Sequence, residues 1–486
     1  MKKGFDNSKY LKIQKEKIEE RIKMFDNKLY LEFGGKLIDD YHAQRVLPGF
    51  EADSKIQLLK EFKEDLEVIL CINASDIEKN KIRADYGISY DLELLRLIDY
   101  MKELQISINS VVITMYTNQK GIDKLQEKLK EKDVKVYIHR PTKGYPNDVK
   151  TIVSEDGYGK NPYIETTKKL VVVTAPGPNS GKLGTCLSQL YHENKQGKKA
   201  GYAKYETFPV WDLSLHHPVN VAYEAATADL EDVNMIDPFH LEAYDKKAVN
   251  YNRDISTFPI LKSILSKIMG EDIYHSPTDM GVNMIAKCIV DDEHVRKEAL
   301  MEIIRRYYNS LCDVKKETGN PAIVNRIEVL MNSLKISKED RKVIEVVNKK
   351  AEELNKNIIA IELENGKIIT GKETKLLSAT SAMFLNAIKE FSYIPDDVHL
   401  LSPVTLDAIF KMKQKTSYKR NYCLNIQEVL IALSICAGSN PIIEKAIDNL
   451  DKLRGLEAHS SYMIEADEMN VIKNLGINLT CEPKYI

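Results

Sequence analysis

The stretch from Lys169 to Glu193 constrains the fold of this chain more than any other. Residues 170–174 are apolar and mostly β-branched, which predicts a buried strand. Residues 175–181 form a turn rich in Pro and Gly, and from Lys182 onward the apolar residues recur at helical spacing. A strand that runs through a glycine turn into a helix is typical of α/β folds. In such a turn the backbone N–H groups and the positive end of the helix face a bound anion.

The turn matches a phosphate-binding Walker A loop (G-x-x-x-x-G-K-[ST]) in part. Gly181 and Lys182 fit the pattern, whereas Pro176 replaces the first glycine and Leu183 replaces the hydroxyl residue that binds Mg²⁺. We predict that Gly177 and Thr185 take over these two roles through small backbone shifts. The residues predicted to bind the phosphate groups are Gly177, Asn179, Ser180, Gly181, Lys182 and Thr185. The alternative left open is an ordinary tight turn with a solvated lysine.

Strands and helices alternate along the first half of the chain. The first predicted strand begins at residue 29, and further predicted strands cover residues 67–71, 110–115, 134–139, 170–174 and 201–208. Predicted helices cover 54–64, 91–104 and 121–132. This alternation predicts an α/β fold with a mostly parallel sheet and helices on both faces, in which ligands bind beyond the carboxyl ends of the strands. Several strands precede the glycine turn, although such a turn usually follows the first strand of a nucleotide-binding unit.

The second half of the chain has a different character. Residues 291–355 carry apolar residues at helical spacing, which predicts a helical region. After residue 356, the Asn365-Gly366 pair between two apolar runs predicts a hairpin, and helices and short strands follow it. We therefore predict three parts: an α/β domain with the phosphate-binding-like turn at 1–290, a helical region at 291–355, and a C-terminal α/β domain at 356–486.

Composition excludes several classes of protein. The net charge is −2, and no module that combines basic and aromatic residues stands out, so we expect no nucleic-acid partner. The seven cysteines are scattered without a C-x-x-C pair, which argues against a disulfide framework or a structural zinc site. No apolar run approaches the roughly 20 residues that span a bilayer, and the N-terminus lacks the apolar segment of a signal peptide. We expect a cytoplasmic protein without a membrane partner.

Polar residues become dense after residue 208. Asp237 follows a short apolar run, where an acid often holds Mg²⁺ in phosphate-handling enzymes, and we predict that it binds the metal together with Thr185. His240 is a predicted general acid or base. His216, His217, Asp237 and His240 also suggest a metal site, although their spacing matches no standard zinc motif. An isolated histidine is more often hydrogen-bonded inside the fold.

Several long motifs together resemble a bacterial family catalogued as domain of unknown function family 1846. The motifs that carry the resemblance are residues 31–36 with 39–42, the glycine–lysine turn, 204–209, 225–230, 237–241, 276–281 and 475–483. The resemblance spans nearly the whole chain. It implies a multidomain cytoplasmic α/β protein with a helical middle and a separate C-terminal α/β region, and it implies no activity.

Three functional hypotheses follow. The first is an enzyme of kinase or ligase type that uses ATP or another nucleotide with Mg²⁺, with Lys182, Asp237 and His240 as catalytic residues and segments 204–254 and 276–283 as the site of a small-molecule substrate. The second is an ATP-independent enzyme that acts on a phosphorylated or carboxylated metabolite. The third is a non-catalytic nucleotide-binding protein that assembles through the helical middle, and a homo-oligomer suits all three hypotheses.

Overall fold

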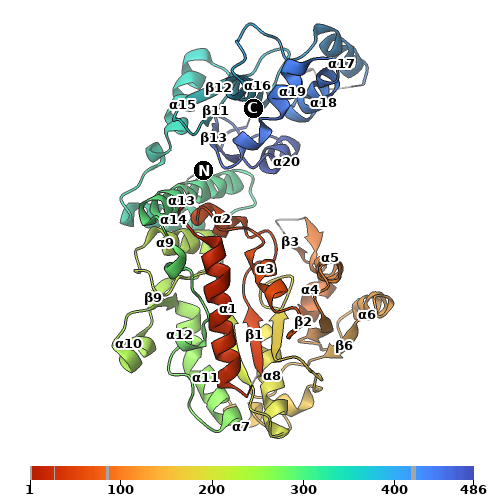
Figure 1. Cartoon of the computed structure of the whole chain (residues 1–486), viewed down its shortest axis with the longest axis vertical. Coiled ribbons are helices and arrows are strands. Elements are labelled where there is room, and N and C mark those ends of the chain that lie inside the picture. The colour runs from red at the N-terminus through yellow and green to blue at the C-terminus, as the bar shows by residue number, and fades with distance from the viewer. Residues whose placement is uncertain (1–2, 27, 84–86, 417–422, 486) are drawn as a thin grey trace. The chain divides into compact units, whose positions relative to one another are not determined.

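The computed structural model of the protein describes residues 3–26, 28–83, 87–416 and 423–485. The chain divides into two compact units, residues 2–299 and residues 300–486, and the division falls inside helix α13 (Asp292–Lys315). We call them the N-terminal and C-terminal units (Figure 1). The finer division of the chain at residues 290 and 355 stays a prediction.

A six-stranded, entirely parallel sheet forms the centre of the N-terminal unit. Its strand order is β6-β5-β2-β7-β1-β8. The strands are β1 (Leu29–Phe33), β2 (Leu66–Asn73), β5 (Ile108–Thr114), β6 (Lys135–Ile138), β7 (Leu170–Thr174) and β8 (Gly201–Tyr205). The predicted α/β class with a mostly parallel sheet is confirmed. All five residues of β7 are buried, as its β-branched run predicts.

The carboxyl ends of the three strands β7, β1 and β8 are level with one another. Glu32 pairs with Val173 on one side and with Lys204 on the other, and Phe33 pairs with Tyr205. The predicted strand 201–208 is therefore too long. Because its partner β1 ends at Phe33, β8 has no ladder to join beyond Tyr205.

The glycine turn lies where the direction of the chain connections reverses. From β2 the chain continues to β5 on one side, whereas from β7 it passes β1 to reach β8 on the other side. Because parallel crossovers are right-handed, these two connections lie on opposite faces of the sheet. The carboxyl ends of β2 and β7 therefore flank a topological switch point, the place where open α/β sheets bind ligands.

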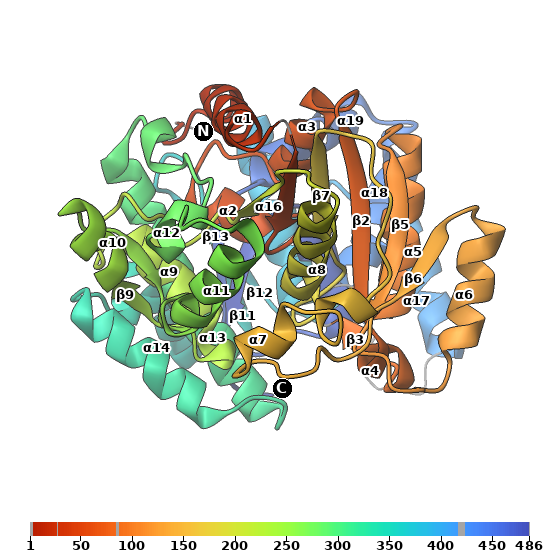
Figure 2. The ribbon, with the colours of Figure 1, turned by 90° about the horizontal axis from the view of Figure 1, so that it is seen from below.

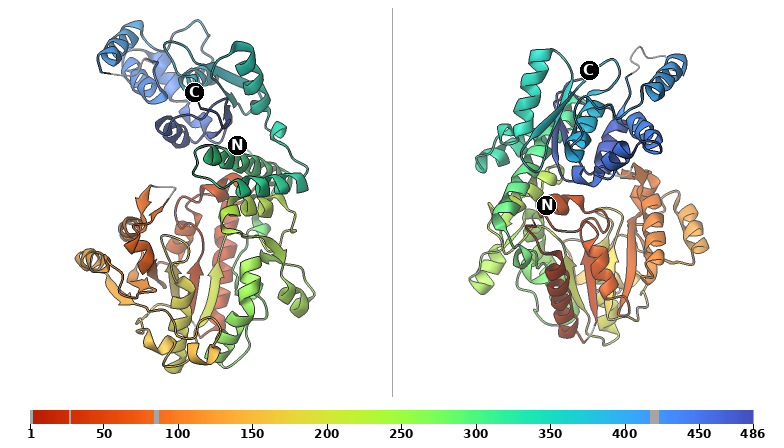
Figure 3. Two further views of the ribbon diagram at one scale, coloured as in Figure 1. Left: turned by 180° about the vertical axis from the view of Figure 1, so that it is seen from behind. Right: turned by 45° about the horizontal axis from the view of Figure 1, so that its top comes forward.

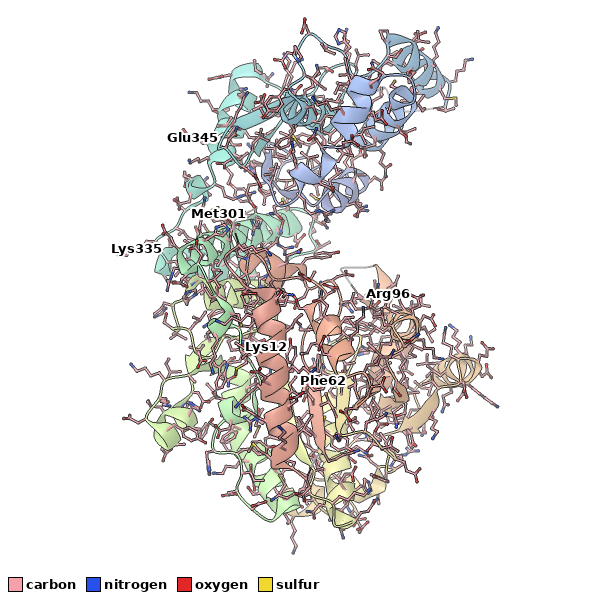
Figure 4. The ribbon with its side chains drawn as sticks, viewed as in Figure 1. Lys12, Phe62, Arg96, Met301, Lys335 and Glu345 are labelled. Carbon is pink, nitrogen blue, oxygen red and sulfur yellow. The ribbon has the colours of Figure 1, made fainter. Side chains whose placement is uncertain are left out.

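Helices cover both faces of this sheet, with α1 and α3 on one face and α8 and α11 on the other (Figure 2; yellow and green in the left view of Figure 3). Phe62 lies at the end of α3 (Figure 4). Its side chain is buried, and the Lys15 ammonium of α1 lies 5.7 Å from its ring centroid. The longer helices are α1 (Asn7–Met24), α3 (Ser54–Glu61), α5 (Tyr90–Glu103), α6 (Ile122–Glu131), α8 (Lys182–Lys195), α9 (Pro218–Ala226) and α11 (Asn252–Met269).

Shorter elements complete the N-terminal unit. The short helices are α2 (Tyr41–Val46), α4 (Ala74–Glu78), α7 (Val149–Ile152), α10 (Pro238–Tyr244) and α12 (Pro277–Met280). Two small antiparallel pairs join β3 (Ile82–Arg83) to β4 (Ile88–Ser89) and β9 (Asn234–Ile236) to β10 (Val249–Tyr251). Helix α9 ends at Ala226, and a short 3₁₀ helix (Ala228–Leu230) follows it.

The C-terminal unit contains a four-stranded mixed sheet of order β12-β11-β13-β14. Its strands are β11 (Ile358–Glu362), β12 (Ile368–Lys372), β13 (Glu457–Ser460) and β14 (Asn478–Cys481). The Asn-Gly hairpin between β11 and β12 is confirmed. The helices are the second part of α13, α14 (Pro321–Ser333), α15 (Lys342–Leu354), α16 (Ala379–Ser392), α17 (Pro403–Thr416), α18 (Ile426–Ala437), α19 (Pro441–Ile447) and α20 (Ala466–Asn474).

Candidate functional site

The glycine turn, residues 175–181, connects the carboxyl end of β7 to the first residue of α8. Gly181 is the N-cap of α8 with φ of 81°, a backbone conformation that favours glycine. A Cβ atom at Gly177 would lie 2.5 Å from the ring of Tyr90, so this position also has no room for a side chain. The two glycines therefore meet steric requirements of the turn.

Side chains from neighbouring strands bind the carbonyl groups of the turn. The Thr114 hydroxyl donates to the Ser180 carbonyl at 2.8 Å, and the Asn73 amide donates to the Asn179 carbonyl at 3.1 Å. Arg83 donates to the Pro176 carbonyl at 2.9 Å. Because these contacts come from the ends of β2 and β5 in the six-stranded sheet and from β3 beside it, they hold the turn in one conformation.

The N–H groups at the end of the turn, unlike its carbonyl groups, lack hydrogen-bond partners among the described residues. The amides of Ser180 and of the next four residues have no hydrogen-bond acceptor among the described residues. The Ser180 hydroxyl is also buried without a partner in the part of the chain that the structure describes. These donors lie at the positive end of a 14-residue helix. An anion is the group that could satisfy them together.

Lys182 and Thr185 occupy different positions in this arrangement. Lys182 is half-buried, and no carboxylate of the described residues lies within ion-pair distance of its ammonium. The Thr185 side chain is buried, donates to the Gly181 carbonyl at 3.0 Å, and accepts from the Cys71 thiol at 3.4 Å. Its hydroxyl thus stabilises the start of α8 against the sheet. The metal role of Thr185 stays a prediction.

Asp237 and His240 lie at the start of α10, outside the six-stranded sheet. One carboxylate oxygen of Asp237 accepts from the amides of Phe239 and His240, and the other accepts from the Thr278 hydroxyl at 2.7 Å. His240 Nδ1 lies 3.0 Å from the Ser276 hydroxyl. These contacts join α10 to α12. No hydrogen bond or ion pair between described residues connects either side chain to Lys182.

A second polar group lies at the ends of β1 and β8. We call it the lysine–acid cluster: Glu32, Lys204, Glu206 and Asp254. The Lys204 ammonium lies 2.7 Å from Asp254 and 3.1 Å from Glu206. Glu32 is next to Lys204 across the strand pair, and its carboxylate accepts from the Tyr202 hydroxyl at 2.8 Å. The cluster therefore places three carboxylates around one ammonium.

Burial and charge shift the pKa values in this cluster. Burial raises the pKa of the Glu206 carboxyl, and the nearby Lys204 opposes that shift only in part. Burial alone would lower the pKa of the Lys204 ammonium, but Asp254, Glu206 and Glu32 outweigh it and raise the pKa. Lys204 is therefore a fixed cation, whereas Glu206 is the member suited to exchange a proton.

Glu206 and its neighbours line a small cavity of about 50 Å³. Its walls come from both predicted substrate segments: Lys204, Glu206, Phe208, Trp211 and Asp254 from the first, and Thr278, Gly281 and Asn283 from the second. Strands lie about 4.8 Å apart, so β8, two strands from β7, is about 10 Å from the glycine turn. A small metabolite is long enough to reach both places.

Glu32, Lys204, Glu206 and Asp254 are not among the site residues predicted from the sequence, although the last three lie in the predicted substrate segment 204–254. A signal was present, because Glu32 and Lys204 interrupt otherwise apolar strands. His217, one member of the alternative metal set, instead pairs with Asp292 at 2.9 Å. Within the described ranges, no group of three or more His, Cys, Asp or Glu side chains has the geometry of a metal site, and no helix is long and apolar enough to cross a membrane.

The sheet, its helical layers and the turn at the switch point define the N-terminal unit as a doubly wound α/β protein with a glycine turn. The chain belongs to the DUF1846 family: that family's N-terminal domain of unknown function matches residues 3–335, and its C-terminal domain matches residues 339–486. A UPF0371 protein of Clostridioides difficile is 53% identical over the whole chain and 98% of its own length. UPF0371 proteins of Clostridium tetani and Clostridium botulinum are each 52% identical with the same coverage.

Proposed function

We propose that the N-terminal unit binds a phosphate-bearing small molecule at the glycine turn and acts on it at the lysine–acid cluster. The observation that carries the proposal is the row of amides from Ser180 to Gly184, which lack acceptors among the described residues while three carbonyls of the turn are bound by side chains. Lys182, in the middle of this row, supplies a cation without a carboxylate partner in the described part of the chain.

The lysine–acid cluster supports an enzyme rather than a passive binding protein. Glu206 has a raised pKa, adjoins a cavity and touches a fixed ammonium, which are properties of a general acid or base. The reaction class that suits these groups is proton transfer to or from a phosphorylated metabolite. This corresponds to the ATP-independent hypothesis.

A nucleotide triphosphate with Mg²⁺ is the second candidate ligand. The position of the turn at the topological switch point favours it, since nucleotides bind there in many α/β proteins. The structure gives less support to the Mg²⁺ ion than to the nucleotide. The side-chain oxygens of Thr185 and Asp237, its predicted ligands, make hydrogen bonds that hold α8 and α10 in place. In both cases we expect a cytoplasmic protein that forms a homo-oligomer.

Ligand-dependent stabilisation tests the proposal. The midpoint of urea unfolding would be measured with inorganic phosphate, a sugar phosphate, ADP and ATP–Mg²⁺. A ligand at 100 times its Kd adds about 2.7 kcal/mol to the free energy of unfolding. Lys182→Ala should remove most of that gain, whereas the matched change Lys124→Ala, at an exposed position on α6, should not. Equal stabilisation of both variants would contradict binding at the turn.

A further inference from the structure

The cavity beside Glu206 has unmet negative charge. The lysine–acid cluster contains three carboxylates and one ammonium, and its side chains are only 20–24% exposed at Lys204, Glu206 and Asp254. The nearby Arg253 leaves the excess unchanged: its charge also acts on Asp254 and Glu206, but it pairs with a fourth acid, the buried Asp232, at 3.5 Å. Buried carboxylates without a countercharge are costly, so a cationic group entering the cavity would be stabilised.

Aromatic side chains form another part of the same wall. Trp211 and Phe208 both line the cavity. The Trp211 indole N–H is already used, since it donates to the Asn283 carbonyl at 2.6 Å, and the Phe208 ring stacks on Tyr223 at 4.8 Å. Aromatic rings beside acidic groups form the environment that selects ammonium groups over neutral groups of the same size.

The lining is held in place before any ligand binds. The Asn283 side chain donates to the carbonyls of Glu206 and Thr207 at 3.0 and 2.9 Å, which fixes the segment after β8. Thr207 also has a buried hydroxyl without a partner among the residues described. A volume of about 50 Å³ is sufficient for one small polar group, since a cavity of roughly 10–15 Å³ already holds a water molecule.

We infer that this cavity binds an ammonium group, so that the ligand of the N-terminal unit is a phosphate ester that also carries a primary or methylated amine. The inference rests on the proposed function, because the phosphate is assigned to the glycine turn. The inference adds a second group that the protein recognises, the amine, and it sets the length of the ligand. The amine and the phosphate are separated by about 10 Å, which is two strand spacings.

The single tryptophan of the chain makes a direct test available. Trp211 fluorescence would be titrated in the full-length protein with a series of ω-aminoalkyl phosphates and with alkyl phosphates of the same chain lengths. For one chain length, the amine member should bind about ten-fold or more tightly than its neutral partner, and it should change the Trp211 emission. Glu206→Gln and Asp254→Asn should each reduce this ratio towards one while affinity for the alkyl phosphate is kept.

Glu242→Gln is the matched control, because Glu242 is exposed on α10 and does not line the cavity. This variant should keep the full ratio. Equal affinity for both members of every pair in the unmodified protein would overturn the ammonium site and leave the phosphate site standing. Binding of neither member would overturn the proposed function and this inference together. Circular dichroism of each variant checks that it is folded. If Glu206→Gln does not fold, Asp254→Asn alone provides the comparison.

Discussion

Thr114 and Gly181 lie in direct contact at the carboxyl edge of the sheet. A Cβ atom at Gly181 would lie 2.7 Å from the Thr114 hydroxyl oxygen and 2.8 Å from the Thr114 Cβ. The same hydroxyl donates to the carbonyl of Ser180. The end of β5 therefore sets the shape of the glycine turn, although β5 and the turn are separated by more than 60 residues in the sequence.

Gly181→Ala is expected to destabilise the protein by about 1–3 kcal/mol, because the new methyl group meets Thr114 and the residue keeps a positive φ. Urea unfolding measures the change. Gly184→Ala, three residues further along α8, is the control: nothing lies within 4 Å of its Cβ position, and alanine is the better helix former by about 1 kcal/mol. Similar losses in both variants would contradict the described turn geometry.

Gly371→Ala is expected to unfold the C-terminal unit or to cost about 3 kcal/mol or more. A Cβ atom there would lie 2.0 Å from the backbone nitrogen of Met383 in α16, and backbone cannot move aside as a flexible side chain does. Gly438→Ala is the matched substitution, since its nearest neighbour is at 3.7 Å. Thermal unfolding followed by circular dichroism compares the two, and a Gly371→Ala protein as stable as Gly438→Ala would refute the packing of β12 on α16.

Arg341→Met is expected to destabilise the C-terminal unit by about 1.5–3 kcal/mol, because it removes a buried charged donor from Glu457 and from two carbonyl groups, although Glu457 keeps its ion pair with Arg305. Arg341 is fully buried, pairs with Glu457 at 2.6 Å and donates to the carbonyls of Ala458 and Asn478. Changing the partner as well, in Arg341→Met with Glu457→Gln, should cost less than the two single changes added together. Urea unfolding of the single and double variants measures the coupling, and strictly additive losses would contradict it.

The stability of the C-terminal unit should fall in acid through Glu482. Burial alone would raise the pKa of Glu482, but hydrogen bonds with His459 at 3.2 Å and Asn348 at 2.9 Å lower it to about 2. A carboxyl with a lowered pKa stabilises the fold above its unfolded pKa of about 4.3 and loses that contribution as the pH falls towards 2.

Urea unfolding at pH 7, 4 and 2 checks this prediction. Glu482→Gln should be less stable than the unmodified protein by about 1–3 kcal/mol at pH 7, and the difference should shrink between pH 4 and pH 2. Glu353→Gln, an exposed position on α15, should follow the unmodified protein at every pH. If the gap between Glu482→Gln and the unmodified protein were the same at all three pH values, another group would account for the acid sensitivity.

Local patterns predict most of the helices and strands because their signals are contained in short segments. The strand 170–174 agrees with β7 residue for residue, since a β-branched run ends at a proline turn. Asp237 has a sequence context that fits two roles. An acid just before a proline is typical of a helix N-cap as well as of a Mg²⁺ ligand, and in the structure Asp237 is the N-cap of α10. Sequence spacing alone does not separate these two roles.

The lysine–acid cluster depends on contacts that no local pattern contains. Glu32, Lys204 and Asp254 come from β1, β8 and α11, and they meet because β8 pairs with β1 rather than with β7, the strand before it in the chain. Strand order follows from how all the helices and strands pack, so spacing in the sequence cannot supply it. The conformation of the glycine turn likewise depends on Asn73, Arg83 and Thr114 from three other strands.

We propose that the amides at the start of α8, which lack acceptors among the described residues, bind phosphate, and backbone NMR tests this binding amide by amide. Inorganic phosphate would be titrated into deuterated, ¹⁵N-labelled protein while the amide resonances are followed. We predict that the amides from Ser180 to Gly184 show the largest shifts and saturate together, and that Lys182→Ala weakens the binding. Saturable shifts elsewhere with these five amides unchanged, or no shifts at millimolar phosphate, would show that the turn does not bind phosphate.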